Sequence, residues 1–535
     1  FVRDPQIGSS NEEKAKTPED IQKPTFLTAQ SEAVRNDTFN WNYTLNRAYS
    51  RTGNSAGFIL SSGDQIQTNA EKVEDGTVSE MEYAGYLSPD IMKSVPVATT
   101  VGNHDADNAN YTYHFNTANL SSLGDNGYVG GDYYFTYGDA LFIILNTQDT
   151  NVSEHKQFIE DTVAANPECK WRIVTLHQDI YGSAEHSNEP EITNLRYSLV
   201  PIFEENDVDI VLTGHDHAYS RTKILKGGQS TTEFEYTDDE FDEQLDKDVD
   251  VGDSTETRYE APANIQDDTT DPAEQRYLEY LYSVMDDEAV QELTENQDVA
   301  VNPDGIMYLT AGSSSGSKYY DLVPRQQTYI ASRWQMDVPT YSVIDLTETT
   351  LTVNTYRTDT DEPIDSQFMI VKSADHSQLT DLISQAEALS ADDYTEDSYS
   401  VMQQALEAAT AVNNDAQATT EELTNAYTAL KSAIDALVEK PVQTPTDDEQ
   451  NGTTTDPSQN GTTTDPSQNG TTENPSQNGS GQGNKNTSAA GVNEKPSTVK
   501  PVKTGDYTSV VIPAAALVLA AAAGGTTFYI RRKRS

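Results

Sequence analysis

Several apolar segments of the chain end in residues that can bind metal ions. The clearest is 208–212, which runs into Gly214-His215-Asp216-His217. Two imidazoles two residues apart on one turn can each reach a different ion, although such pairs are also common as surface polar residues. Segment 58–60 likewise precedes Gly63-Asp64, segment 95–98 precedes Gly102-Asn103-His104-Asp105, and segment 171–174 precedes His177. The pattern predicts a metal-binding side chain at the carboxyl end of each of these strands.

Helical patterns separate the strands. Apolar residues recur at helical spacing in 41–48, 158–163 and 195–202. Strands alternating with helices indicate an α/β sheet, in which ligands bind beyond the carboxyl ends of the strands. We expect one α/β domain over residues 1–372, and Phe1-Val2-Arg3-Asp4 is typical of the end of a strand that starts upstream of Phe1. Segments 305–311 and 341–356 resemble β-hairpins that close the sheet, and we assign them no chemistry.

Composition narrows the possible partners. The chain has 535 residues, too many for one core, and 87 acidic against 34 basic residues give a net charge of -53. Such a charge repels nucleic acids and anionic lipids, so we expect no nucleic-acid binding. The single cysteine, Cys169, excludes an internal disulfide and a cysteine-built zinc site, and we expect it to be a buried apolar residue.

An acidic insertion occupies about 226–300. Within it Asp246, Asp248 and Asp250 alternate as in a calcium loop, but the glycine comes one place late and no glutamate stands at the twelfth position. A mobile acidic flap is favoured over a calcium site.

Residues 376–440 change to a purely helical pattern. Three segments each have one apolar stripe, and Thr419 with Glu422 predicts a capping box on the third. The stretch resembles the FIVAR modules of Gram-positive surface proteins, which share the Asp393-Tyr394-Thr395 start of the second helix and the alanine-rich body. The resemblance implies a three-helix bundle, which we interpret as a spacer in preference to a carbohydrate-binding module.

The following residues, 441–500, are of low complexity. Positions 451–477 are three copies of a nine-residue unit, Asn-Gly-Thr-Thr-Thr-Asp-Pro-Ser-Gln, with small changes in the last. Without apolar side chains such a segment cannot offset the entropy of ordering, so we expect a disordered, extended stalk.

Residues 501–535 have the pattern of a membrane anchor. Positions 509–530 are apolar and would span about 33 Å as a transmembrane helix, and the basic cluster at 531–534 marks the cytoplasmic side. Together with Pro501-Val502-Lys503-Thr504-Gly505 they resemble a sortase sorting signal, although the usual form begins Leu-Pro. The resemblance implies cleavage between Thr504 and Gly505, linkage by a sortase to cell-wall peptidoglycan, and an extracellular location on a Gram-positive-type bacterium. The membrane would be a partner only through this helix, before sorting.

The strand-end motifs form an ordered set. Their order resembles the calcineurin-like metallophosphoesterases, and residues 208–222 resemble the purple acid phosphatase branch of that family. The resemblance covers most of 1–372 and implies a β-sandwich flanked by helices, holding two divalent ions (Mn, Fe, Zn or Mg). The implied metal ligands are Asp4, Asp64, Asn103, His177, His215 and His217.

The resemblance also assigns roles. Asp4, Asp64 and His217 would bind the first ion, and Asp64, Asn103, His177 and His215 the second, with Asp64 bridging. His104 would donate a proton to the leaving oxygen, and Asp105 would orient its ring. His186 and Gln6 are the candidate substrate contacts.

Two positions depart from the family pattern. The purple enzymes have a tyrosine, which binds ferric iron, where this chain has Gln67, and many relatives have a histidine in place of Gln6. We therefore expect a colourless protein whose first site is rich in oxygen ligands and favours a hard ion such as Mn²⁺ or Mg²⁺.

The expected function is hydrolysis of small phosphate monoesters by a hydroxide held between the ions. A nucleotidase or phosphodiesterase is the alternative within the enzyme class, and a non-catalytic adhesion or display protein is the alternative outside it. We expect structural roles for His114, His155, His376, Arg196 and Arg221.

Overall fold

The computed structural model describes residues 1–8, 19, 22–67, 77–106, 109–228, 236–249, 263–291, 293, 298–372, 374, 376–415 and 418–441. The predicted stalk, sorting signal and membrane span fall beyond these residues, apart from position 441. Among the described helices, none has the length and hydropathy needed to cross a bilayer.

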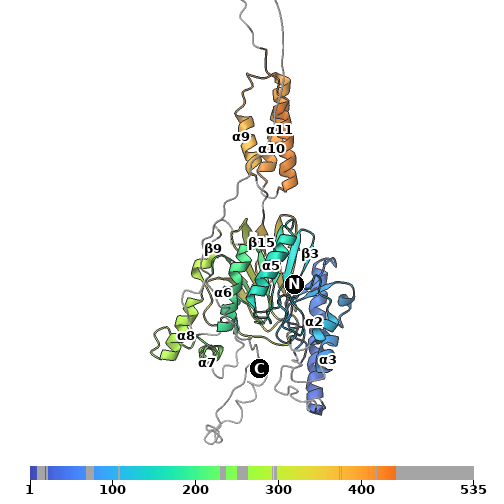
Figure 1. Cartoon of the computed structure of the whole chain (residues 1–535), viewed down its shortest axis with the longest axis vertical. Helices are drawn as coiled ribbons and strands as arrows, with labels where there is room; N and C mark the ends of the chain where they lie inside the picture. The colour runs from blue at the N-terminus through green and yellow to red at the C-terminus, as the bar shows by residue number, and fades with distance from the viewer. Residues whose placement is uncertain are drawn as a thin grey trace, which may run out of the picture.

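A seven-stranded sheet forms the centre of the α/β domain (Figure 1). Its four middle strands are mutually parallel, and β3, β7 and β12 are antiparallel to their neighbours. The middle strands are buried along their whole length except at Arg172, which explains why they are continuous apolar runs in the sequence. In spatial order the strands are β12 (Ile330–Trp334), β7 (Tyr219–Thr222), β11 (Met307–Thr310), β6 (Ile210–Thr213), β5 (Trp171–Thr175), β4 (Ala140–Ile144) and β3 (Tyr133–Tyr137).

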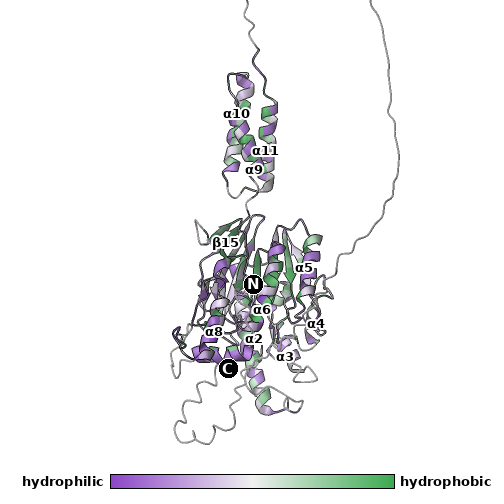
Figure 2. Ribbon diagram, turned by 60° about the vertical axis from the view of Figure 1, so that its left-hand side comes forward, coloured by the Kyte–Doolittle hydropathy of each residue, from purple (hydrophilic) through white to green (hydrophobic). Residues whose placement is uncertain are grey.

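A second layer of strands packs against this sheet. Apolar side chains from both layers share one core that includes Leu60, Phe142, Ile210, Val353 and Phe368. Figure 2 shows the hydrophobic colour concentrated on the strands, while the helices carry both colours. The second layer contains β10 (Val299–Val301), β15 (Phe368–Val371), β14 (Thr350–Arg357) and β13 (Thr340–Leu346), and the parallel pair β1 (Ile59–Ser61) and β2 (Val97–Thr99).

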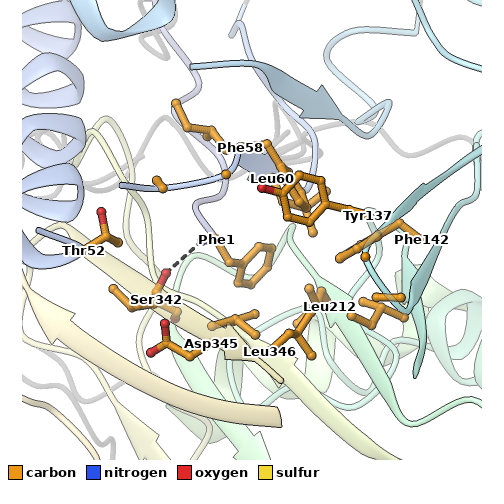
Figure 3. Close-up of a pocket in the computed structure, with 18 of the residues that line it drawn as sticks. Phe1, Thr52, Phe58, Leu60, Tyr137, Phe142, Leu212, Ser342, Asp345 and Leu346 are labelled. Carbon is orange, nitrogen blue, oxygen red and sulfur yellow. Dashed lines mark hydrogen bonds between the residues drawn. The ribbon is translucent and has the colours of Figure 1, made fainter. Parts of the chain in front are cut away.

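The first two residues connect the β1–β2 pair to β13. Val2 bridges Ser61 in parallel. The amino group of Phe1 donates to Ser342 O at 2.8 Å, and Ser342 N donates back to Phe1 O at 2.9 Å. The Phe1 ring lies in a cavity of about 550 Å³ between the layers (Figure 3), whose lining includes Leu212 and Leu346 but no candidate metal ligand.

Helices cover the outer faces. Helices α5 (Val152–Ala165) and α6 (Pro190–Glu205) pack on the seven-stranded sheet through residues such as Ile159 and Phe203. On the other side, Trp41 of α2 (Pro24–Arg51) stacks on Tyr86 of α3 (Thr77–Tyr86) and belongs to a core with Val2 and Tyr341. The helices expected around 41–48, 158–163 and 195–202 are thus confirmed, and the domain is mixed α/β. Shorter elements are η2 (Asp90–Lys93), α4 (Asn110–His114), η3 (Asp287–Ala289), β8 (Ile224–Leu225) and β9 (Val290–Gln291).

One strand differs from expectation. Strands β13 and β14 form an antiparallel hairpin, as predicted for 341–356. The segment predicted as a second hairpin, 305–311, is instead the central strand β11, which pairs in parallel with β6. The loop after β11 therefore reaches the same edge of the sheet as the loop after β6.

The acidic insertion contains two packed helices, α7 (Asp238–Val249) and α8 (Pro272–Ser283). Phe241 and Leu245 of α7 share a core with Tyr277 and Leu281 of α8. Asp248 is buried in α7, accepts a hydrogen bond from Ile265 N at 2.8 Å and pairs with Arg325. The calcium-loop alternative is wrong, because Asp246 and Asp248 lie on helix α7. The described part of the insertion is a folded subdomain instead of a solvated flap.

The three remaining helices, α9 (Ser377–Glu387), α10 (Glu396–Asn413) and α11 (Thr420–Asp435), share a core of their own. Leu382, Met402 and Leu430 are buried in it. Thr419 and Glu422 form the capping box at the start of α11.

Candidate metal centre

The predicted ligands come from different strands and meet at one edge of the sandwich. Asp64 follows β1, Asn103 follows β2, His177 follows β5, and His215 follows β6. Asp64, His177 and His215 offer ligand atoms that all lie within 4.8 Å of one another. Asn103 Oδ1 lies 3.0 Å from His177 Nε2, so it belongs to the same group.

Asp4 and His217 complete the set from the other side. Asp4 Oδ1 lies 3.7 Å from His177 Nδ1, and Asp4 Oδ2 accepts the backbone N–H of His215 at 2.8 Å. His217 donates from Nδ1 to the carbonyl oxygen of Lys318 at 3.0 Å, and His177 donates from Nδ1 to that of Ser62 at 2.9 Å. Each contact fixes a proton on Nδ1 and orients the ring, as second-sphere partners do for metal-binding histidines.

The backbone is strained at these positions. Asp4, Asp64, His215 and His217 have φ angles of 38°, 45°, 73° and 33°. Such angles cost energy for a residue with a side chain and cluster at functional sites, which is where they lie here. Gly102 also stands where no side chain fits, since a Cβ atom there would lie 2.0 Å from Asp64 Oδ1.

The electrostatics suit bound cations. Burial raises the pKa of Asp64, but His177 and His104 outweigh it and hold the pKa at about 2. Burial, with neighbouring cationic groups, lowers the pKa of His215 and of His217 well below the ordinary value, so both rings are neutral, the form that binds metal.

Several buried polar atoms here have no hydrogen-bond partner among the described residues. The oxygens among them are Asp4 Oδ1, Gln6 Oε1 and Gln67 Oε1. Uncompensated buried oxygens are costly, and divalent cations would satisfy them. Three histidines, two carboxylates and an amide are also ligands that Mn, Fe and Zn accept, so the residues fit the two ions that the sequence predicted.

His104 is held beside Asp64, the residue expected to bridge the two ions. Its backbone N–H donates to Asp64 Oδ1 at 3.0 Å, and its Nε2 lies 3.9 Å from Asp64 Oδ2. The Nδ1 atom lies 2.7 Å from the carbonyl oxygen of Gln67. Asp105 instead accepts the backbone N–H groups of Gln65 and Gly102 and the hydroxyl of Tyr83. The expectation that Asp105 orients the His104 ring is corrected: the Gln67 carbonyl does so, and Asp105 holds the loop.

His186 also reaches the centre. Its ring centroid lies 4.8 Å from that of His215, and its Nδ1 bonds to Glu189. Burial lowers the pKa of His186, but the Glu189 carboxylate outweighs burial and raises the pKa to about 10. The ring is therefore cationic at neutral pH. Gln6 lies beside the centre as well, since its backbone N–H donates to Asp64 O at 2.8 Å.

The family model described as calcineurin-like phosphoesterase matches residues 36–219. The chain carries a calcineurin-like phosphoesterase domain. The matched range contains Asp64, Asn103, His177, His215 and His217, and Asp4 lies ahead of it.

The phosphoesterase domain has purple acid phosphatases among its relatives. It is 26% identical over 181 residues to purple acid phosphatase 4 of Arabidopsis thaliana, covering 30% of this chain and 52% of that protein. Purple acid phosphatase 18 of the same plant is 38% identical over 60 residues, covering 11% and 14% of the two chains. A solved purple acid phosphatase from yellow lupin seeds aligns at 13% identity with a TM-score of 0.36, covering 62% of this chain and 49% of its own. The chain thus spans about half the length of the first relative.

Two residues of the phosphoesterase domain that the motifs did not reveal also border the centre. The Tyr320 ring lies 5.2 Å from that of His217 and 4.7 Å from that of His186, between centroids. The Lys318 ammonium lies 4.7 Å from the Tyr320 ring centroid. Both follow β11, and the run of apolar residues into Gly312 is the same signal that marked the other motifs.

The residues expected to be structural have structural partners. Arg221 makes two contacts to Asp365, at 2.6 and 3.2 Å. Arg196 is fully buried and donates to the carbonyl oxygens of Val284 and Ser187. His114 faces Glu80, His155 pairs with Asp132, His376 bonds to Asn413 O, and Cys169 is buried.

Proposed function

We propose that the protein hydrolyses small phosphate monoesters with two divalent ions held at this centre. The observation that carries the proposal is the group of Asp64, His177 and His215, whose ligand atoms lie within 4.8 Å of one another inside a calcineurin-like phosphoesterase domain. When bound, two such ions activate water and neutralise phosphoryl oxygens.

The protein's own residues supply the rest of the chemistry. When both its ring nitrogens are protonated, His104 can donate the Nε2 proton to the leaving oxygen and become neutral, while Nδ1–H stays bound to the Gln67 carbonyl. The cationic ring of His186 and the ammonium of Lys318 attract the dianion of a monoester more strongly than the monoanion of a diester. This positive charge favours a monoester substrate over a phosphodiester. It does not distinguish a general phosphatase from a nucleotidase, because nucleoside monophosphates are themselves monoesters.

A substrate panel on the full chain tests this proposal. After chelation and addition of Mn²⁺, we expect faster turnover of p-nitrophenyl phosphate than of bis(p-nitrophenyl) phosphate, with Asp64→Ala as the inactive control. Preference for the diester would favour a phosphodiesterase. Stoichiometric metal without turnover of any ester would favour the display protein.

We further propose that the protein is displayed on the cell wall, with the helices of 376–440 as a spacer. The support is the C-terminal sequence, in which Thr504-Gly505, an apolar span and a basic tail follow one another. Fractionation of the producing cells tests it. Wild-type protein should require cell-wall digestion for release, whereas Thr504→Ala protein should be extracted by detergent with the membrane.

A further inference from the structure

Arg3 precedes the ligand Asp4 and places a positive charge inside the metal centre. Its Nε lies 3.1 Å from Asp4 Oδ2, and both side chains are 0% exposed. Within the described part of the chain, none of its three guanidinium nitrogens has a hydrogen-bond partner. A guanidinium keeps its charge at any pH a protein experiences, so a full positive charge is buried against this carboxylate.

The charge acts on a ligand of one ion. The guanidinium lies against the Asp4 carboxylate, which also accepts the backbone N–H of His215 at 2.8 Å. Asp4 and His217 are the two ligands that only the first ion uses. Arg3 and that ion therefore compete for the same carboxylate.

The second position is built differently. Asp64, His177 and His215 already lie together, and Asn103 Oδ1 is 3.0 Å from His177 Nε2. The first position shares Asp64 and adds Asp4, whose carboxylate Arg3 already contacts. The two halves of the centre thus differ in both geometry and charge.

We infer that Arg3 makes the two metal positions unequal, so that the second ion is held tightly and the first exchanges with the surrounding solution. The inference rests on the proposed two-ion function and deepens it: hydrolysis would follow the free concentration of the divalent ion. Arg3 is a positioning residue in this scheme, because it acts through Asp4.

Equilibrium dialysis of the chelated full chain against Mn²⁺ tests the inference. The wild type should bind one ion tightly and a second at least about tenfold more weakly, a modest share of what one buried charge can contribute. Arg3→Gln should tighten the weak site by about tenfold and leave the tight site unchanged. Arg3→Lys, which keeps the charge, should retain the difference. Arg172→Gln removes a positive charge paired with Asp207 and should also retain it.

Two equal affinities in the wild type, or a weak site that Arg3→Gln leaves unchanged or weakens, would overturn the inference. If circular dichroism shows that Arg3→Gln is unfolded, Arg3→Met provides the neutral variant, with the same expected tightening. If the wild type binds two ions with equal affinity and hydrolyses esters, this inference is wrong and the proposed function stands. No bound ion and no hydrolysis would remove both.

Discussion

The Nδ1 atom of His104 lies 2.7 Å from the carbonyl oxygen of Gln67. A carbonyl oxygen can only accept, so this contact fixes a proton on Nδ1. The other ring nitrogen, Nε2, lies 3.9 Å from Asp64 Oδ2. The backbone N–H of the same histidine is bound to Asp64. This bond ties the loop after β2, which carries the proposed proton donor, to Asp64 in the loop after β1.

Replacing His104 should slow turnover without removing metal. We expect His104→Ala to lower kcat by about 100-fold on a substrate with a poor leaving group, because a general acid is lost. Metal content by atomic emission should stay at the wild-type value. His376→Ala, in the helical bundle, is the matched control and should leave kcat unchanged. A wild-type rate for His104→Ala would refute the assigned role.

Replacing Asp64 should empty the whole centre. Its carboxylate lies 3.4 Å from His177 Nε2 and is the one ligand assigned to both ions. We expect Asp64→Ala to lose both ions and nearly all activity, measured by metal analysis and ester hydrolysis. Asp90→Ala, at an exposed aspartate, should change neither. Two ions retained by Asp64→Ala would show that the bridge is assigned to the wrong residue.

The protein should be colourless and should recover activity best with Mn²⁺ after chelation. A visible charge-transfer band needs a phenolate on ferric iron, and neither Gln6 nor Gln67 provides one. An absorption spectrum of the iron-loaded protein and a metal reactivation series check this, and Gln67→Tyr should tighten iron binding. A purple wild type would show that a tyrosine such as Tyr320 reaches the metal.

The buried pair of His155 and Asp132 should make stability depend on pH. Their Nδ1 and Oδ2 atoms lie 2.8 Å apart and both side chains are 0% exposed. Burial lowers the pKa of His155, but Asp132 outweighs it, so the pKa in the folded protein is raised above the ordinary 6.5. The stabilisation by the charged pair is then complete below the unfolded pKa and is lost as pH rises through the folded pKa.

Urea unfolding of wild type and His155→Gln, each measured at about pH 5.5 and about pH 9, tests this linkage. We expect the variant to be less stable by about 3 kcal/mol at the lower pH and by less at the higher pH. Lys156→Gln, which removes an exposed charge from the neighbouring position, should show no such convergence. A difference that grows with pH would reverse the assignment of the charged state.

The sequence predicted that the candidate ligands gather, because each follows an apolar strand and parallel strands end at the same edge of a sheet. It missed Lys318 and Tyr320 because 305–311 was interpreted as a hairpin, although the apolar run into Gly312 was the same signal, and the acidic insertion separates β11 from its parallel partner β6. The role of Asp105 was misassigned for a similar reason. Adjacency in sequence suggested that it faced His104, but a tight turn carries its carboxylate back to the N–H groups of Gln65 and Gly102.

The bond between Phe1 and Ser342 joins positions 341 residues apart. A contact of that span costs the most chain entropy and forms late, whereas β4, β5 and β6 pair across far shorter loops. During synthesis Phe1 can make this bond only after β13 has left the ribosome. The contact between the β1–β2 pair and β13 is therefore among the last to close the second layer of strands.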